Sequence, residues 1–270
     1  MRFPECTIHR FPQRSEEWFN IRKGKLTGSA MGSWLAERPE VRLTIPEIKD
    51  ILTASGIDFR KSATRPDLLT KIVNAGQYAS YTKSFESARL TALSKLIGSI
   101  SACNEPDEWE VDPDGPPPRN PALWAVWNGI RLEAEAVERF QNDTGLEVEE
   151  VGFCEHRSKY SGVSPDGLIV GKNEGFEGKA PLSATHARYL LEGTLPDAYR
   201  DQVHGSMAVT GADAWWFQSY CPGAIIEVFR IRVERDEYTE RMESGLIEFA
   251  DYVKSETRRL IEMSKEGGQS

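Results

Sequence analysis

The sequence is poor in the residues and runs that mark disulfide-bonded, zinc-binding or membrane proteins. Its four cysteines and four histidines are scattered over 270 residues. No C-x-x-C pair is present, and the histidines do not have the spacing of zinc ligands. No apolar run approaches the length of a membrane span. We therefore expect ordinary thiols and no membrane association.

Positive charge is also scarce. Lysine and arginine total 33 against 42 aspartates and glutamates, a formal net charge of -9. This balance argues against a protein that holds nucleic acid by bulk charge, so any such contact must be local. Residues 1–6 (MRFPEC) lack the apolar core of a secretory signal. The protein is therefore expected to stay in the cytoplasm.

The most informative motif is S-P-D-G-L at residues 164–168, followed by Glu177-Gly178-Lys179. Side chains alternate along a strand, so Glu177 and Lys179 share one face and Gly178 turns away. If Leu168 pairs with Glu177, residues 170–175 form the turn and Asp166 lies opposite Lys179 on the same face. A slip of one residue would break this arrangement.

Two acids and a lysine on one face suggest a Mg²⁺-dependent nuclease. A hard divalent ion takes carboxylate and carbonyl oxygens, and it can activate water and neutralise charge on a phosphoryl group. Bound cations would also balance an acidic site while a basic groove elsewhere follows the phosphates. Each half of the motif is common by itself, so a plain turn and a solvated strand face remain the alternative.

The chain length suits one large domain or a compact domain with an insertion. We expect a single domain over residues 1–270, with a helical insertion and a proline-rich loop at about 36–120. A helix capped by Ser15 should run through Lys23. After the insertion, the pattern predicts an α+β order: helix 122–145, strands 147–154, 162–170 and 175–180, helices 184–192 and 196–209, strands 214–220 and 225–234, and a final long helix.

Two polar helix residues are further candidates for the site. Glu133 borders the apolar stripe of helix 122–145 and could overhang a metal site. Its alternative is a solvated acidic face shared with Glu135 and Glu138. Gln202 lies on helix 196–209, where a surface amide is the alternative.

A third group lies near the N-terminus. Arg22 comes at the end of the helix capped by Ser15, and Thr27 or Ser29 could cap a second helix. Helix starts attract phosphate, and a planar guanidinium beside one suits an anion. A surface ion pair is the alternative for Arg22.

Taken together, the motifs resemble the phage lambda-type exonucleases, which are related to viral alkaline exonucleases and belong to the PD-(D/E)XK superfamily. The resemblance covers about half of the chain and leaves residues 36–120 outside. It is carried, in order, by EWFNIRKGKLTGS (17–29), WNGIRLEAEA (127–136), SPDGL (164–168), EGK (177–179), and the pair AYRDQVHGSMAVTG (198–211) and AWWFQSY (214–220).

The resemblance implies a restriction-endonuclease-like core, in which a central mixed, mainly antiparallel sheet is flanked by helices. It also implies a role for each candidate residue. Asp166 and Glu177 would be metal ligands with the Gly178 carbonyl, and Glu133 would lie near the metals directly or through water. Lys179 would orient or deprotonate the attacking water, and Gln202 would support it. Arg22, Thr27 and Ser29 would receive a terminal 5′ phosphate.

The implied activity is a 5′-to-3′ exonuclease that uses Mg²⁺ or Mn²⁺, two ions per site. It would degrade one strand of linear double-stranded DNA from a 5′-phosphorylated end, releasing 5′-phosphomononucleotides and leaving 3′ tails for recombination by strand annealing. The resemblance further implies a homotrimeric ring, a single-strand annealing protein as partner, and a phage or prophage origin. A structure-specific or restriction-like endonuclease and a non-catalytic DNA-binding scaffold remain as alternatives.

Overall fold

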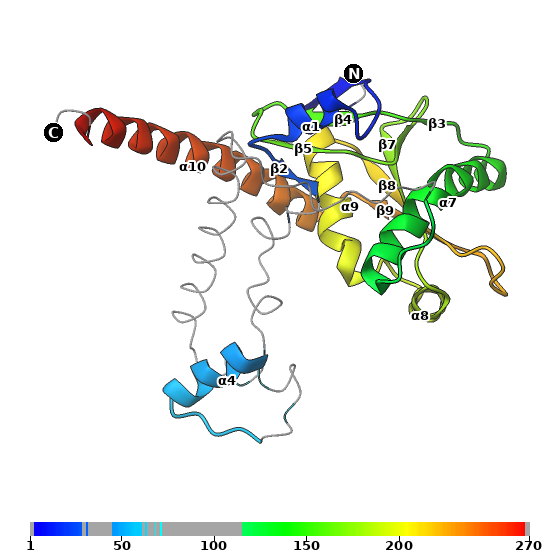
Figure 1. Ribbon diagram of the computed structural model, residues 1–270, viewed down its shortest axis with the longest axis horizontal. Coiled ribbons are helices and arrows are strands. Elements are labelled where there is room, and N and C mark those ends of the chain that lie inside the picture. Colours follow the sequence, from blue (N-terminus) through cyan, green and yellow to red (C-terminus); the bar gives the residue numbers. More distant parts are fainter. Residues whose placement is uncertain are drawn as a thin grey trace.

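Two β-sheets meet across a central helix in the structure, a computed structural model that describes residues 3–28, 31, 45–60, 63, 68, 71 and 115–267 (Figure 1). The strands are β1 (Cys6–His9), β2 (Leu26–Thr27), β3 (Val148–Glu149), β4 (Phe153–His156), β5 (Ser161–Val163), β6 (Gly167–Ile169), β7 (Glu174–Lys179), β8 (Ala214–Tyr220) and β9 (Val228–Glu234). The helices are α1 (Glu16–Arg22), α4 (Ile45–Ala54), α7 (Pro121–Thr144), α8 (Ser183–Glu192), α9 (Asp197–Thr210) and α10 (Glu237–Gly267).

The strands form one sheet of order β1-β4-β5-β2 and a second of order β3-β6-β7-β8-β9. Most neighbours are antiparallel, but β2 runs parallel to β5 and β7 runs parallel to β8. The parallel pair β7–β8 is joined through α8 and α9, because parallel strands need a long crossover. The predicted α+β class with a mixed, mainly antiparallel sheet is confirmed.

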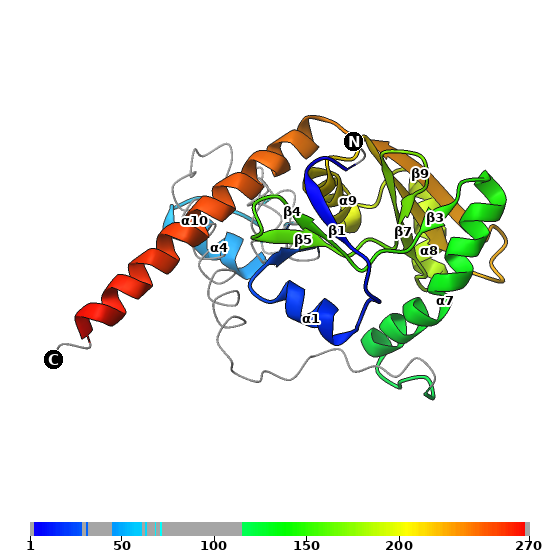
Figure 2. The ribbon, with the colours of Figure 1, turned by 90° about the horizontal axis from the view of Figure 1, so that it is seen from above.

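Helix α9 packs between the two sheets. Its buried Val203 and Met207 belong to the same apolar core as Trp215 and Phe217 of β8 and Val163 of β5. Figure 2 shows β4 and β5 passing over α9, with α10 alongside. The helix is thus covered on more than one side, which explains why eight consecutive residues, Val203–Thr210, are buried.

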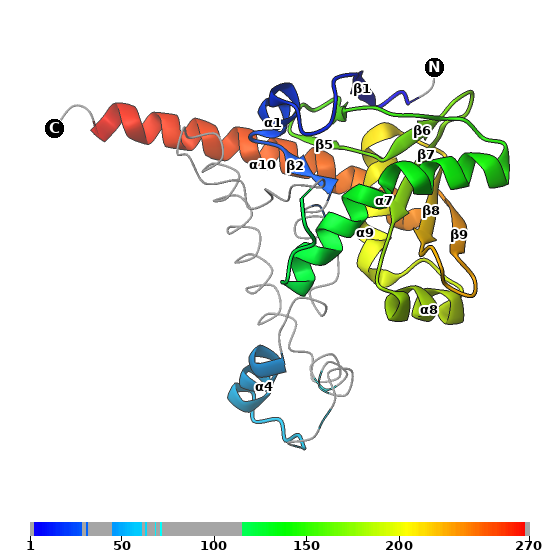
Figure 3. The ribbon, with the colours of Figure 1, turned by 45° about the vertical axis from the view of Figure 1, so that its right-hand side comes forward.

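Helix α7 covers the opposite face of the second sheet (Figure 3). The Phe140 ring lies 4.6 Å from the Phe176 ring and 5.6 Å from the Trp216 ring, measured between centroids. Phe176 therefore faces α7, and alternation along β7 directs Glu177 and Lys179 towards α9. The two side chains therefore lie between β7 and α9.

Two predicted strands were wrong in their extent. The segments 147–154 and 162–170 each break into two strands that belong to different sheets, β3 and β4 in the first case and β5 and β6 in the second. Pro165 separates β5 from β6, because it has no N–H to give to a ladder. Gly152 separates β3 from β4, where its N–H donates to the His9 carbonyl at 2.9 Å. A Cβ at Gly152 would lie 2.2 Å from the Phe11 carbonyl oxygen, so only glycine allows this approach.

The predicted hairpin register was also wrong, by two residues. Leu168 pairs with Gly175 rather than with Glu177, and Gly167 pairs with Phe176. The turn is correspondingly shorter, because β7 begins at Glu174. A shift of two residues preserves the face, since side chains alternate with period two. Asp166, just ahead of β6, consequently lies level with Glu177 instead of Lys179.

The N-terminal helix was predicted correctly, since Ser15 caps α1 by accepting a hydrogen bond from the Trp18 N–H. Thr27 ends strand β2, and Gly28 and Met31 are helical, so the predicted second helix begins directly after Thr27. Within the insertion, α4 packs Ile48 and Leu52 against Leu68 in a small core of its own. Most of the insertion predicted at about 36–120 falls outside the described residues.

Two further sequence predictions concern the cysteines and membrane association. Cys6, Cys154 and Cys221 are free thiols, and Cys103 lies outside the described part of the chain. Over the described ranges, no helix combines the length and the apolar character that a membrane crossing requires.

Candidate active site

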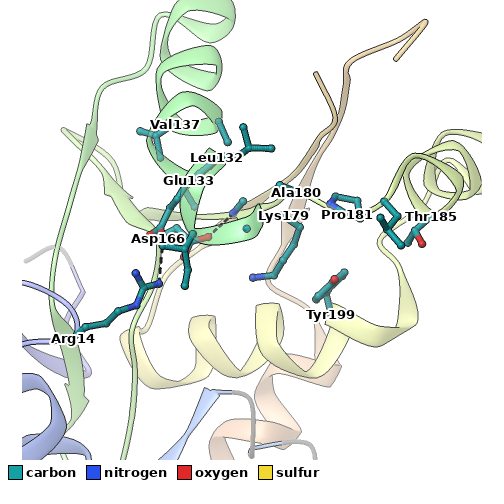
Figure 4. A pocket seen from close by; sticks show the side chains of 16 residues that line it. Arg14, Leu132, Glu133, Val137, Asp166, Lys179, Ala180, Pro181, Thr185 and Tyr199 are labelled. Carbon is teal, nitrogen blue, oxygen red and sulfur yellow. Dashed lines mark hydrogen bonds and ion pairs between the residues drawn. The ribbon is translucent and has the colours of Figure 1, made fainter. Parts of the chain in front are cut away.

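A cavity of about 380 Å³ opens where α7, β7 and the start of α9 approach one another. Its lining includes Glu133 from α7, Asp166, Lys179 from β7 and Tyr199 from α9. Arg14 extends towards Asp166 and Glu133 from one side, and Lys179 and Tyr199 face them from the other (Figure 4). Two carboxylates and two cations thus gather from distant parts of the sequence.

The hairpin brings Asp166 and Glu177 together. The Gly178 N–H donates to Asp166 Oδ2 at 2.7 Å, which ties the S-P-D-G-L segment to β7. Glu177 is only 2% exposed. Burial, together with the nearby charge of Asp166, raises the pKa of Glu177 to about 7. The positive charge nearby therefore does not offset the burial of this carboxylate.

Glu177 is held by two donors. The Gln202 amide donates to Glu177 Oε1 at 2.6 Å, and the Lys179 ammonium donates to the same oxygen. Burial acts to lower the pKa of Lys179, but the Glu177 and Asp166 carboxylates outweigh it and raise the pKa above its ordinary value. The Lys179 Nζ also lies 5.5 Å from the centre of the Tyr199 ring. Lys179 is therefore a cation in this state.

Glu133 differs from the other acids of its helix. It faces the cavity, whereas Glu135 and Glu138 are exposed, and Glu135 accepts a hydrogen bond from Tyr220 at 2.6 Å. Burial and the charge of Asp166 raise the pKa of Glu133. The Arg14 guanidinium lies 3.7 Å from Glu133 Oε2. The alternative of one uniform solvated acidic face does not describe Glu133.

The residues present suit a hard divalent cation. The described residues contain no group of three or more His, Cys, Asp or Glu side chains arranged as a metal site. The predicted metal site instead combines two carboxylates, those of Asp166 and Glu177, with a backbone carbonyl, and Glu133 lies further away. Oxygen donors of this type are those that Mg²⁺ and Mn²⁺ take. The raised pKa values of Glu133 and Glu177 mark a site that a cation would relieve.

The predicted 5′-phosphate ligands, which include Arg22, lie beside the acidic residues of the candidate metal site. The Arg22 guanidinium donates to Ser164 Oγ at 3.1 Å and stacks on Trp18, 4.0 Å from the ring centroid. The Trp18 indole N–H donates to the same Ser164 oxygen at 2.8 Å. Burial lowers the pKa of Arg22 to about 10, which still leaves it charged near neutral pH. Among the described residues no carboxylate pairs with Arg22.

Thr27 and Gln202 lie on neighbouring elements. Thr27 of β2 pairs with Gly162 of β5, just before Ser164. A Cβ at the next residue, Gly28, would lie 4.0 Å from Gln202 Cγ. The segment that carries the predicted phosphate ligands is therefore adjacent to α9. Ser29 lies outside the described residues.

Sequence reasoning missed three residues that the structure places here. Ser164 appeared only as part of the turn motif, yet it joins Arg22 to the Asp166 loop. Arg14 and Tyr199 were not selected, although both line the cavity. The only available signals were that Arg14 precedes the helix cap and that Tyr199 precedes Gln202 by about one helical turn. Neither signal is specific.

In this layout a strand hairpin presents two acids and a lysine against a helix, which is consistent with a restriction-endonuclease-like core. More particularly, the fold is similar to that of an alkaline exonuclease. The crystal structure of the alkaline exonuclease LHK-Exo from Laribacter hongkongensis matches with a TM-score of 0.61 and 22% identity, covering 93% of this chain and 99% of that one. The complex of LHK-Exo with dAMP matches with a TM-score of 0.56 and 22% identity, covering 92% and 100%.

The sequence comparison agrees with the fold. Residues 110–213 match the YqaJ-like viral recombinase domain, a range that contains Glu133, Asp166, Glu177, Lys179 and Gln202. No curated protein matches the sequence. The resemblance to phage lambda-type exonucleases is therefore confirmed in the domain match and in the fold.

Proposed function

We propose that this protein is a DNA exonuclease of recombination that degrades one strand of linear duplex in the 5′-to-3′ direction from a 5′-phosphorylated end. The observation that carries the proposal is the double use of the loop at residues 164–166. The Ser164 hydroxyl accepts a hydrogen bond from Arg22, a half-buried cation that pairs with no carboxylate among the described residues, and Asp166 lines the cavity. One loop thus connects an anion site with the candidate hydrolytic site.

A bound 5′-terminal nucleotide would use both the Arg22 site and the acidic cavity. Its terminal phosphate would bind Arg22 and the Thr27 hydroxyl, and the next phosphodiester would then reach the acids of the cavity. Guanidinium groups suit phosphate because they offer parallel N–H donors. An enzyme that cut only internal sites would not need a cation for a terminal phosphate bonded to the loop that carries Asp166. Ser29 completes the proposed phosphate site.

The cavity residues have separable roles in this proposal. Asp166, Glu177 and the Gly178 carbonyl would hold Mg²⁺ or Mn²⁺, in one or two ions, with Glu133 close by. A bound ion supplies an activated water and neutralises charge on the phosphoryl group. Lys179 would orient that water and accept or release its proton, and Gln202 would fix the Glu177 carboxylate, to which it donates a hydrogen bond. Tyr199 closes the cavity next to Lys179.

The related structures support the same chemistry. LHK-Exo is described as an alkaline exonuclease and has been solved with dAMP. A deoxynucleoside monophosphate is the product class that the proposal requires. The YqaJ-like viral recombinase match supports a place in recombination and a phage or prophage origin. A homotrimeric ring and a single-strand annealing partner are proposed from the family resemblance, and a ring would retain DNA despite the net charge of -9.

The test compares linear duplexes with a 5′ phosphate or a 5′ hydroxyl, with and without Mg²⁺. Wild type should release mononucleotides from the phosphorylated end only when Mg²⁺ is present, and Asp166→Asn should be inactive. Arg22→Ala should lose the preference for the phosphate while retaining the acid cluster. Ser164→Ala, which removes the bond to Arg22, should reduce that preference partly. Cutting of a closed circle would instead favour the endonuclease alternative, and Mg²⁺-independent binding without release would favour a scaffold.

A further inference from the structure

Arg14 occupies a turn position that residues with a side chain rarely adopt. Its φ is 64°, in the left-handed region. The Ser15 N–H donates to the Pro12 carbonyl at 3.3 Å, so residues 12–15 form a β-turn with Arg14 at its third position, where glycine or asparagine is usual. The turn accounts for the backbone conformation, but it does not account for an arginine at this position.

The neighbouring residue holds Arg14 in place. The Gln13 amide donates to the Val151 carbonyl at 3.2 Å and to the Pro165 carbonyl at 2.9 Å. Pro165 immediately precedes Asp166, so this bond fastens the N-terminal turn to the acidic loop itself. The left-handed turn at Arg14 then directs the guanidinium towards the cavity (Figure 4).

The contact with Glu133 does not account for the strained conformation. The two groups are 3.7 Å apart, and the side chains of Arg14 and Glu133 are 52% and 39% exposed. A long, exposed ion pair adds little stability, less than a left-handed arginine costs. Strain of this kind is characteristic of functional sites, where a side chain must be presented in one direction.

We propose that Arg14 is a substrate-contacting residue that binds the non-bridging oxygens of the phosphodiester to be cut, and that Glu133 is its partner only in the free protein. This inference rests on the proposed function. A guanidinium provides two parallel donors for a phosphate, and half of this side chain is open to solvent. The incoming phosphodiester replaces Glu133 as the partner of Arg14, which leaves the Glu133 carboxylate facing the other acids. Arg22 binds the 5′-terminal phosphate of the DNA strand, and Arg14 binds the next phosphodiester, which is the one that is cut.

Glycine and lysine variants separate this role from a structural one. Arg14→Gly suits the left-handed backbone, so it should fold with a melting temperature within a few degrees of wild type. Arg14→Lys keeps the charge but loses the planar pair of donors. Arg157→Gln is the matched control, because Arg157 also forms an exposed ion pair, with Glu5 at 2.7 Å.

Three measurements are needed: steady-state kinetics on 5′-phosphorylated duplex, duplex affinity with Ca²⁺ in place of Mg²⁺, and Mn²⁺ binding without DNA followed by electron paramagnetic resonance. Arg14→Gly should lower kcat/KM by about tenfold or more, the size expected for a lost charge-assisted hydrogen bond. It should weaken duplex affinity, while Mn²⁺ binds as tightly as in wild type or more tightly because a neighbouring cation is gone. Arg14→Lys should fall between, and Arg157→Gln should match wild type.

The outcomes are distinguishable. If wild type is active and Arg14→Gly has the same kcat/KM and duplex affinity, the role assigned to Arg14 is overturned while the proposed function stands. Loss of Mn²⁺ binding in Arg14→Gly also overturns it, because Arg14 would then support the carboxylates rather than the substrate. A wild-type protein that leaves every linear duplex intact rejects the proposed function and this inference with it.

Discussion

The Gln202 amide nitrogen lies 2.6 Å from Glu177 Oε1, the carboxylate oxygen that also accepts from Lys179. The bond crosses from α9 to β7 and links residues 25 positions apart in the sequence. Because Glu177 is buried, a change in the orientation of its carboxylate would directly change the geometry of the candidate site. Helix α9 therefore does more than fill the space between the sheets, since it holds the carboxylate of a candidate metal ligand.

Replacing Gln202 should reduce catalysis more than stability. Gln202→Ala removes a hydrogen bond to a charged group, a contact of about 1.5–3 kcal/mol. We expect kcat at saturating Mg²⁺ to fall by about tenfold to a hundredfold. Ser206→Ala is the control, because the Ser206 hydroxyl donates to the Gln202 backbone carbonyl one turn further along the same helix. Equal kcat values for the two variants would contradict the role assigned to the Gln202 side chain.

His156 should make the fold sensitive to mild acid. Burial, followed by the charge of Arg157, lowers the pKa of His156 from 6.5 to about 4. Between these values the unfolded ring binds a proton and the folded ring does not, so the free energy of unfolding falls as the pH drops from about 6.5 towards 4. The contribution is at most about 3 kcal/mol. It is fully present above pH 6.5.

Urea unfolding from pH 4 to pH 7 checks this expectation. His156→Phe keeps a ring but cannot titrate, so the difference in stability between wild type and the variant should shrink or reverse towards pH 4. A difference that stays constant with pH would assign the acid sensitivity to other groups, such as the carboxylates of the cavity.

Two glycine-to-alanine substitutions should have opposite effects on stability. At Gly175, a Cβ would lie 2.3 Å from the buried Trp215 ring, so Gly175→Ala should destabilise the fold by about 1–3 kcal/mol or more. At Gly129 in α7, a Cβ meets nothing within 4 Å. Gly129→Ala should stabilise the fold by about 0.5–1 kcal/mol through helix propensity. Thermal melts of both variants measure the contrast, and a neutral Gly175→Ala would show that β7 and β8 can separate there.

The local patterns predicted most of the secondary structure but not its grouping. The periodicity from 122 to 145 located α7 to within a residue, because one apolar stripe packs on a sheet. The segments 147–154 and 162–170 were each read as one strand, because the alternation of side chains continues through short breaks. Only the placement of Pro165 and Gly152 between two sheets separated them.

For the candidate site, too, the sequence predicted local features but not the contacts between distant elements. The alternation in E-G-K placed Glu177 and Lys179 on one face, and this held even though the register was two residues away from the prediction. Gln202 and Glu133 were selected as polar residues on apolar helices. Their contacts, with Glu177 and Arg14 respectively, could not be predicted because they join elements far apart in the chain.

The sequence by itself determined which side chains share a face, because strand and helix periods are local properties of the backbone. It thus placed an acid and a lysine together on β7 and an arginine at the end of α1. The tertiary structure decided which faces meet. It set Arg22 against Ser164, Gln202 against Glu177 and Arg14 beside Glu133, because burying the apolar faces of α7 and α9 on the sheets leaves these polar groups only one place to converge.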